Sequence, residues 1–234
     1  MSELAVTMPR IALIHALEES VAPIRDAFAR LWPEAQIADL LDTSLSADLA
    51  RAGRLDQAMI TRFLKLGRYA ALGSGAQDTQ AILFTCSAFG PAIDAVRSAL
   101  SIPVLRPNQA AFAEALILGA RIALVVTFPP SLPALMRELQ DMASALGKTI
   151  HITPILADGA LAALKVGDGA GHDAIVLAAC KDIGAQDVVL LGQFSLARAA
   201  RVLQPCFGCP VITTPDSAVR ALRRLLPCPE RTAS

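Results

Sequence analysis

Residues 81–105 read AILFTCSAFGPAIDAVRSALSIPVL, and residues 188–213 read VVLLGQFSLARAARVLQPCFGCPVIT. Each segment begins with a short aliphatic run, turns at a polar residue and continues with the apolar spacing of a helix. If Cys86 is aligned with Gln193, the prolines that follow them by 17 residues also coincide. This repeat predicts two similar halves that differ at one reactive position, a thiol in one and an amide in the other.

Aliphatic runs alternate with helical segments along the whole chain, and RIALIHA from Arg10 matches RIALVVT from Arg121. Such alternation predicts parallel sheets covered by helices on both faces. We expect an α/β fold with two similar parallel-sheet lobes, pseudo-twofold symmetry and an active site in the cleft between them. The expected strands are 11–15, 36–41, 82–85, 104–105, 122–126, 150–155, 188–191 and 211–213. The expected helices are 21–31, 55–72, 92–100, 111–118, 132–146, 172–183, 196–203 and 218–226.

The repeat also divides the chain into lobes. We expect residues 1–106 together with 208–234 to form the first α/β lobe and residues 107–207 to form the second. The final strand and helix are assigned to the first lobe because the parity of the strands suggests that they return to it. Ligands in open α/β sheets bind beyond the carboxyl ends of the strands, so residues just after each strand are the site candidates.

Composition excludes several classes of protein. Hydrophobic residues make up 54% of the chain and aromatic residues 4%, which indicates an aliphatic core. The 21 basic residues balance the 21 acidic ones, whereas nucleic-acid binders usually carry a basic excess. No apolar run reaches the roughly 18 residues of a membrane span, and the N-terminus lacks the features of a signal peptide. We therefore expect a cytoplasmic protein without nucleic-acid or membrane partners.

The five cysteines are expected to be reduced thiols. Cys206 and Cys209 form a CxxC, but no second ligand pair of suitable spacing accompanies it, so we predict no metal site. Cys86 leaves a buried strand and enters a tight turn that opens a helix at Pro91. The positive end of that helix is expected to favour the thiolate. Alternatively, Cys86 is an inert buried cysteine.

The turn FTCSA at 84–88, its counterpart LLGQFS at 190–195 and the turns that open each half resemble the aspartate/glutamate racemase superfamily. That superfamily includes aspartate, glutamate and hydantoin racemases, maleate isomerase and arylmalonate decarboxylase, and the resemblance covers nearly the whole chain. In the family two cysteines face each other across the substrate carbon, and no cofactor is used. The resemblance implies that Cys86 is catalytic and that Gln193 stands where the second cysteine would be.

The resemblance implies a cofactor-independent enzyme of amino acid metabolism, of racemase or isomerase type. A thiol would transfer a proton at the carbon alpha to a carboxylate of a small acid. A homodimer is compatible with it. Gln193 departs from the pattern, because a carboxamide cannot exchange a proton in the required range. Three alternatives stay open: a single-cysteine decarboxylase of the arylmalonate decarboxylase kind, a hydrolase or lyase with a Cys86 nucleophile assisted by His15, and a non-catalytic ligand-binding protein.

The turns after the strands expose backbone N–H groups and hydroxyls, and by resemblance such turns bind the substrate carboxylate. The substrate-binding candidates are His15, Thr85, Ser87, Ala88, Thr127, Phe128, Ser131, Phe194 and Ser195. Ser131 and Ser195 fit equally well as helix caps, and His15 as a structural histidine at a strand end. His172 opens a helix, and no role is predicted for it.

Overall fold

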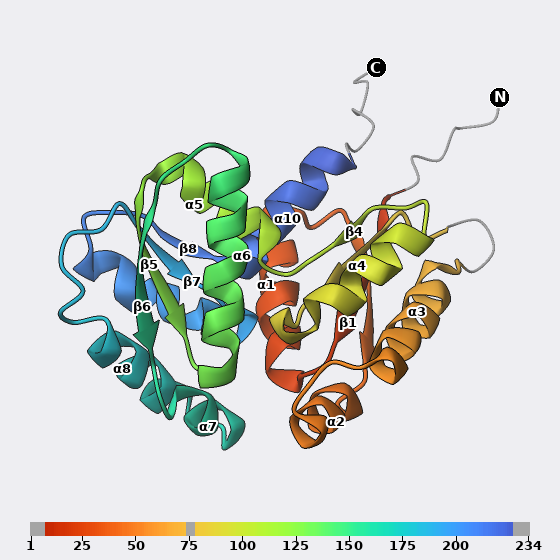
Figure 1. The fold of residues 1–234 in the computed structure, drawn as a ribbon, viewed down its shortest axis with the longest axis horizontal. Helices are drawn as coiled ribbons and strands as arrows, with labels where there is room; N and C mark the ends of the chain where they lie inside the picture. Colours follow the sequence, from red (N-terminus) through yellow and green to blue (C-terminus); the bar gives the residue numbers. More distant parts are fainter. Residues whose placement is uncertain (1–7, 74–77, 227–234) are drawn as a thin grey trace.

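The computed structural model describes residues 8–73 and 78–226, which form two lobes side by side, each built on its own sheet (Figure 1). Residues 1–7 and 227–234, the two ends of the predicted first lobe, lie outside the described residues. Every pair of hydrogen-bonded strands is parallel among the residues described. The predicted α/β class with two parallel-sheet lobes is confirmed.

The first lobe alternates strands and helices as the sequence predicts. Its sheet has the order β2-β1-β3-β4. Its elements are β1 (Arg10–His15), α1 (Val21–Leu31), β2 (Gln36–Leu41), α2 (Ser44–Ala52), α3 (Gln57–Ala71), β3 (Ala81–Phe84), α4 (Gly90–Ala99) and β4 (Val104–Leu105). Two 3-10 turns follow β1 and β3, namely η1 (Glu18–Ser20) and η2 (Ser87–Phe89).

The second lobe repeats this plan with the order β6-β5-β7-β8. Its elements are α5 (Gln109–Leu118), β5 (Arg121–Val126), α6 (Leu132–Ala145), β6 (His151–Leu156), α7 (Ala160–Lys165), α8 (Gly169–Ala179), β7 (Val188–Leu191), α9 (Ala200–Leu203), β8 (Val211–Thr213) and α10 (Thr214–Leu225). The turns η3 (Pro129–Ser131) and η4 (Phe194–Ala199) follow β5 and β7, and η5 (Gln204–Cys206) follows α9. Because β1 to β4 and β5 to β8 occupy the same places in their sheets, turns η1 and η2 correspond to η3 and η4.

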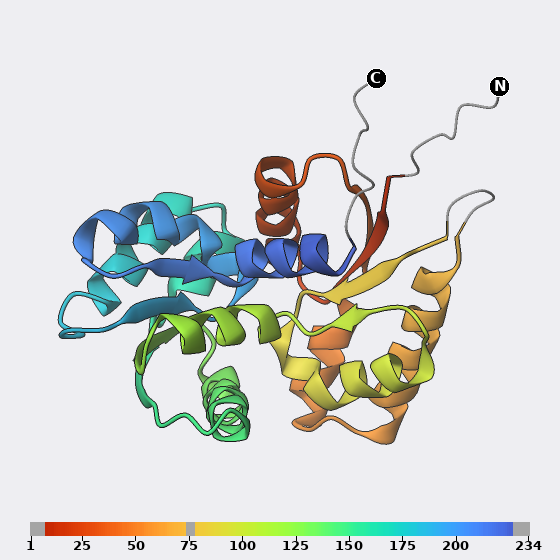
Figure 2. The ribbon, with the colours of Figure 1, turned by 90° about the horizontal axis from the view of Figure 1, so that it is seen from above.

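The final strand lies in a different sheet from the one we expected. β8 hydrogen-bonds to β7 in the second lobe, where it takes the place that β4 has in the first. Only the helix after it crosses over. Ala218, Val219 and Leu222 of α10 pack in the same buried cluster as Ile11 and Leu13 of β1. Figure 2 shows α10 running from the second lobe to the junction between the lobes.

The lobes also exchange side chains at their junction. Phe194, from the turn after β7, is 2% exposed and packs in the first-lobe cluster with Ile11 and Leu13. Asn108, which follows β4, donates a hydrogen bond of 2.9 Å to the carbonyl of Gly192. Turns η1 and η4 are in contact. The carboxyl ends of the two sheets therefore meet at the junction of the lobes.

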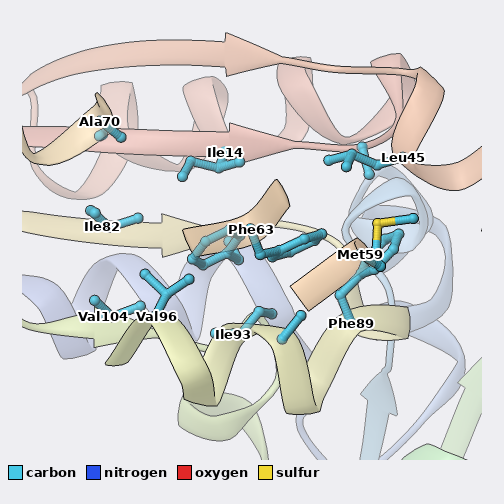
Figure 3. Close-up of a cluster of buried hydrophobic side chains, with 14 residues drawn as sticks. Ile14, Leu45, Met59, Phe63, Ala70, Ile82, Phe89, Ile93, Val96 and Val104 are labelled. Atoms are coloured by element: carbon cyan, nitrogen blue, oxygen red, sulfur yellow. The ribbon is translucent and has the colours of Figure 1, made fainter. Parts of the chain in front are cut away.

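An aliphatic and aromatic core lies on the α3–α4 face of the first sheet (Figure 3). Phe63 of α3 stacks on Phe84 at 5.3 Å and lies 4.8 Å from Phe89, measured between ring centroids. Phe84 ends β3 and Phe89 ends η2, so the core packs against both sides of the turn between them. Burial of aromatic side chains is a large stabilising contribution in such a cluster.

Two helices, α2 and α7, were not predicted. Helix α2 follows a turn in which the Asp42 carboxylate accepts hydrogen bonds from Ser44, and it stops at Gly53, whose φ is 66°. Such a left-handed residue is a common helix end for glycine. Both missed helices are short and lie near the ends of β2 and β6, where the sequence reads as a loop. None of the described helices is long and apolar enough to cross a membrane.

Candidate active site

Cys86 and Gln193 occupy equivalent positions in the two lobes. Each residue lies two positions after the strand in its lobe, β3 or β7, and directly precedes a 3-10 turn. Both have extended backbones, with φ and ψ of −117° and 122° for Cys86 and −138° and 146° for Gln193. The alignment predicted from the repeat therefore places one thiol and one amide at matching sites on the carboxyl edges of the sheets.

The Cys86 thiol is a weak acid in this setting. Its side chain is half-buried and packs against the α3–α4 core. Burial raises the pKa of Cys86 to about 11, and a hydrogen bond from the backbone N–H of Ala88 offsets only part of this effect. The effect of the helix start, which was expected to make the thiolate prevail, is therefore outweighed by burial. At neutral pH Cys86 is a protonated thiol, which can donate a proton.

A small apolar recess, too tight to hold a water molecule, adjoins the thiol. It is lined from the first lobe by the ends of β1 and β3, by helices α2 and α3 and by turn η2. The lining residues are Ile14, His15, Ala16, Leu45, Phe63, Phe84, Cys86 and Phe89. A low-dielectric wall of this kind disfavours the charged form of a group beside it, which explains the raised pKa of the thiol.

Gln193 is held by residues that follow β5. Its Oε1 accepts hydrogen bonds from the backbone N–H of Thr127 at 2.7 Å and from the Thr127 hydroxyl at 2.8 Å. Its Nε2 lies 3.4 Å from the Ser131 hydroxyl. An amide nitrogen carries two N–H groups, so one donor remains beyond the contact with Ser131. The side chain can donate a hydrogen bond to a ligand, but it cannot take up or release a proton.

Two serines at equivalent positions, one in each lobe, stabilise the turns after β1 and β5. Ser20 donates to the carbonyl of Leu17, and Ser131 donates to the carbonyl of Phe128, each at 2.7 Å. In the first lobe Ser20 contacts Thr85, which precedes Cys86, at 2.9 Å. In the second lobe Ser131 contacts Gln193 itself. Both serines thus connect the turn after one strand to the turn that carries the candidate residue of the neighbouring strand.

His15 and Thr85 do not face a ligand. Both are buried, His15 at 0% and Thr85 at 4% exposure, and the His15 ring bonds through Nδ1 to Thr85 and through Nε2 to Asp39. Burial lowers the pKa of His15, and Asp39 opposes this effect. The proposal that His15 assists a nucleophile is wrong in this geometry, because both ring nitrogens are already engaged with protein groups.

The remaining candidates separate into surface and buried residues. Ser87 is half-buried and Ala88 is exposed in η2, and Phe128 is 43% exposed after β5. Thr127 and Ser195 are buried, at 5% and 8% exposure. The first three can meet a ligand directly. The buried residues, with Phe194 in the lobe junction, support the turns.

Sequence patterns did not reveal several residues of the lobe junction and of the network behind the site. Arg106, after β4, pairs with Asp94 of α4 and, at 3.3 Å, with Glu138 of α6, so it joins the two lobes. Burial raises the pKa of Glu138, and Arg106 opposes this effect. Asp39 and Ser20, the partners of His15, were missed as well. The sequence does contain a signal for Ser20. The interval between the end of β1 and Ser20 equals the interval between the end of β5 and Ser131.

The described cysteines outside the site are Cys180, Cys206 and Cys209, and all three are free thiols. Among the described residues no group of three or more His, Cys, Asp or Glu side chains is placed to hold a metal ion. Cys206 is exposed and Cys209 half-buried. His172 is fully buried beside Asp173, at 2.9 Å, in a helix of the second lobe, and it takes no part in the site.

A family model described as Asp/Glu/Hydantoin racemase matches residues 46–222. Curated protein sequences yield no match.

Solved structures of similar fold include a glutamate racemase from Campylobacter jejuni, with a TM-score of 0.69 and 17% identity over 96% of this chain and 89% of that one. An allantoin racemase from Klebsiella pneumoniae has a TM-score of 0.67 and 20% identity over 93% and 87% of the two chains. A mutant of arylmalonate decarboxylase has a TM-score of 0.62 and 17% identity over 93% of each chain. At these identities the structural likeness shows a shared fold.

Proposed function

The chain belongs to the Asp/Glu/hydantoin racemase family, and we propose that it is a cofactor-independent enzyme of racemase or isomerase type in which the Cys86 thiol transfers a proton. The transfer takes place at the carbon alpha to a carboxylate of a small acid. The observation that carries this proposal is the Cys86 thiol at the carboxyl edge of the first sheet, at the position equivalent to that of the Gln193 amide in the second lobe.

The roles of the site residues follow from their chemistry. A thiol whose pKa is about 11 is protonated at neutral pH and gives its proton to a more basic carbanion or enolate carbon. The N–H of Ala88 then stabilises the thiolate that remains. The free N–H of Gln193 and the groups exposed on η2 bind the substrate carboxylate or the developing enolate oxygen.

Proton transfer of this kind is one-sided. A two-base racemase needs a titratable group on each face of the substrate carbon, and Gln193 supplies none. Turnover of isomerase type on one face requires that the Cys86 thiolate first removes the alpha proton, and that the resulting thiol then returns it to carbon from the same face. This geometry also favours a second candidate function, decarboxylation, because loss of CO2 generates the carbanion without a base and leaves a single protonation to Cys86. The arylmalonate decarboxylase that shares the fold carries out a reaction of this class by its name.

Nucleophilic hydrolysis has less support. The attacking species would be the thiolate, and a thiol with a pKa of about 11 supplies little of it at neutral pH. No general base contacts it within the described residues, since both nitrogens of His15 bond to Asp39 and Thr85.

The test is turnover of a panel of small acids by wild-type protein and by Cys86→Ser. The panel contains both enantiomers of aspartate and glutamate, allantoin and phenylmalonate, and products are followed by chiral chromatography and CO2 release. We expect Cys86→Ser to lose roughly 10²–10⁴-fold of the rate on any substrate that is turned over, because serine is a far weaker acid.

Cys206→Ser is the matched control, because that thiol is exposed on η5. It should leave the rate unchanged. Full activity of Cys86→Ser, or an equal loss in Cys206→Ser, would overturn the proposal. If the panel binds with micromolar affinity and none of it is turned over, the protein is a ligand-binding member of the family.

A further inference from the structure

A buried hydrogen-bonded network lies behind the turn that carries Cys86. The His15 Nε2 lies 2.8 Å from Asp39 Oδ1, and its Nδ1 lies 2.9 Å from the Thr85 hydroxyl. The Thr85 hydroxyl lies 2.9 Å from that of Ser20, which in turn lies 2.7 Å from the carbonyl of Leu17. Four close contacts therefore run from a carboxylate on β2 to a carbonyl in the turn after β1. Two longer contacts accompany them: His15 Nδ1 lies 3.3 Å from the Ser20 hydroxyl, and the Thr85 hydroxyl lies 3.4 Å from the carbonyl of Ile14.

The number of protons needed by the four close contacts favours a charged ring. Leu17 offers only a carbonyl, so the Ser20 hydroxyl donates its proton there, and its oxygen must accept from Thr85. Thr85 has then used its own proton, and the contact with Nδ1 needs a proton on the ring. The contact with Asp39 needs another on Nε2. A neutral imidazole has one N–H, whereas an imidazolium has two.

A neutral ring would leave one of the close contacts without a hydrogen. Two lone pairs would then face each other at 2.9 Å in a buried site, which is a costly arrangement. The nearby charges act in opposite directions, because Asp39 raises the pKa of His15 whereas the Arg25 guanidinium lowers it. Arg25 of α1 donates two hydrogen bonds to Asp39 Oδ2, at 2.8 and 2.6 Å, and so favours an ionised carboxylate beside Nε2.

Burial acts against the charged ring and, together with the Arg25 charge, outweighs Asp39 and lowers the pKa of His15. The two hydroxyls add a contribution of the opposite sign. They form an ordered chain of acceptors that only a doubly protonated ring can use in full, and hydrogen bonds to charged groups are stronger than neutral ones. The charged groups that contact this network in the described chain are Asp39 and, through it, Arg25.

We propose that His15 is a buried imidazolium held by Asp39, and that it acts as a positioning residue by fixing Thr85 and with it the turn that carries Cys86. The inference rests on the proposed role of Cys86. Through its hydrogen bonds the His15 ring connects β1, β2, η1 and the end of β3 directly before the thiol. In the second lobe Gln193 bonds directly to Thr127 and Ser131, so that turn needs no ionised anchor.

The charge of the ring is tested by NMR on the isotope-labelled full chain. Only three histidines are present, and the His15 signals are assigned from their loss in His15→Asn. At neutral pH we expect the ring nitrogens of His15 to show an imidazolium, and those of Asp39→Asn to show a neutral ring. A neutral ring in the wild-type protein would overturn the assignment of charge.

The positioning role is tested by the rate at which iodoacetamide alkylates Cys86, followed by peptide mass spectrometry. In His15→Gln the side-chain amide takes the place of Nε2, so the contact with Thr85 is lost. In His15→Asn the side-chain amide takes the place of Nδ1, so the contact with Thr85 is retained. We expect His15→Gln and Thr85→Val to change the Cys86 rate by roughly 2- to 10-fold, the effect of one hydrogen bond. His15→Asn should stay close to wild type.

Arg30→Gln is the matched control, because it removes an exposed ion pair with Asp216 from the same helix as Arg25. It should leave the Cys86 rate unchanged. Wild-type rates in both His15→Gln and Thr85→Val would overturn the positioning role. If His15→Gln does not fold, Thr85→Val decides alone. Neither readout uses turnover, so failure here is distinct from an active Cys86→Ser, which would overturn the proposed function.

Discussion

At Cys86 two effects of the surroundings oppose each other. The start of α4, next to η2, favours a thiolate, by about 0.3–1 kcal/mol for an exposed group near a helix end. Burial against the first-lobe core favours the neutral thiol and raises the pKa from 9.0 to about 11. A shift of two units corresponds to roughly 2.7 kcal/mol, so burial prevails. The residue is therefore better suited to donating a proton than to attacking a carbon.

This difference predicts the pH dependence of alkylation at Cys86. Because the pKa in the folded protein is about 11, the thiolate fraction at mildly alkaline pH should be about 100-fold below that of a thiol with a pKa of 9.0. We expect the rate with iodoacetamide, followed by mass spectrometry, to keep rising until pH approaches 11. A plateau near pH 8 would contradict the burial argument.

The same pKa has a consequence for stability. The folded pKa lies above that of the free thiol, so the neutral thiol contributes stability below pH 9.0 that is lost as pH rises towards 11. Cys86→Ser should remove this contribution. Denaturant unfolding of the wild-type protein and of Cys86→Ser, as pH rises from 9.0 towards 11, measures this contribution to the free energy of unfolding and provides the control for the alkylation profile.

At the scale of secondary structure, the strands and their order along the chain were largely predictable. Buried parallel strands read as continuous aliphatic runs, and four of the eight predicted ranges, including 36–41 and 188–191, match the structure at both ends. Strand parity predicted the wrong sheet for the last strand, because the pairing of β8 with β7 follows the repeat. The match of the prolines before β4 and β8 already indicated that β8 belongs to the second sheet.

The partners of His15 could not be predicted, because they depend on register. Asp39 becomes a neighbour only because β2 pairs with β1 so that Leu13 lies opposite Asp39. That register also brings Asp39 within reach of Arg25 on α1. By contrast, the equivalence of Cys86 and Gln193 follows from spacing along one chain, so the sequence was sufficient to find it.

Helices α3 and α4 pack closely at Gly67. A Cβ placed on Gly67 would lie 2.4 Å from Cγ1 of Val96. Alanine gains up to about 1 kcal/mol over glycine in a helix, whereas overpacking typically costs about 1–3 kcal/mol. We therefore expect Gly67→Ala to lower the free energy of unfolding by about 1 kcal/mol in denaturant titration. Gly208→Ala, where nothing lies within 4 Å of the added Cβ, should stay within about 0.5 kcal/mol of wild type; an equal change in both variants would contradict the packing argument.

At the scale of the whole molecule, Phe194 links the second-lobe turn to the first-lobe core. Its ring is 2% exposed and packs with β1 of the other lobe. Phe194→Ala should lower the free energy of unfolding by about 3–5 kcal/mol, because it empties a buried aromatic site. Phe128→Ala is the control for stability, since its ring is 43% exposed, and should change it by about 0.5 kcal/mol at most. Similar losses in the two variants would show that Phe194 does not join the lobes.

The central claim is that proton transfer comes from the Cys86 lobe alone. It is tested most directly by turnover in deuterium oxide of whichever acid of the panel is accepted, with the configuration of the labelled product read by NMR and chiral chromatography. We expect deuterium in a single configuration from the wild-type protein, and increased racemisation of that product by Gln193→Cys, which places a second thiol at the equivalent site. Interconversion of both enantiomers at comparable rates by the wild-type protein would contradict the one-sided mechanism and require a second base.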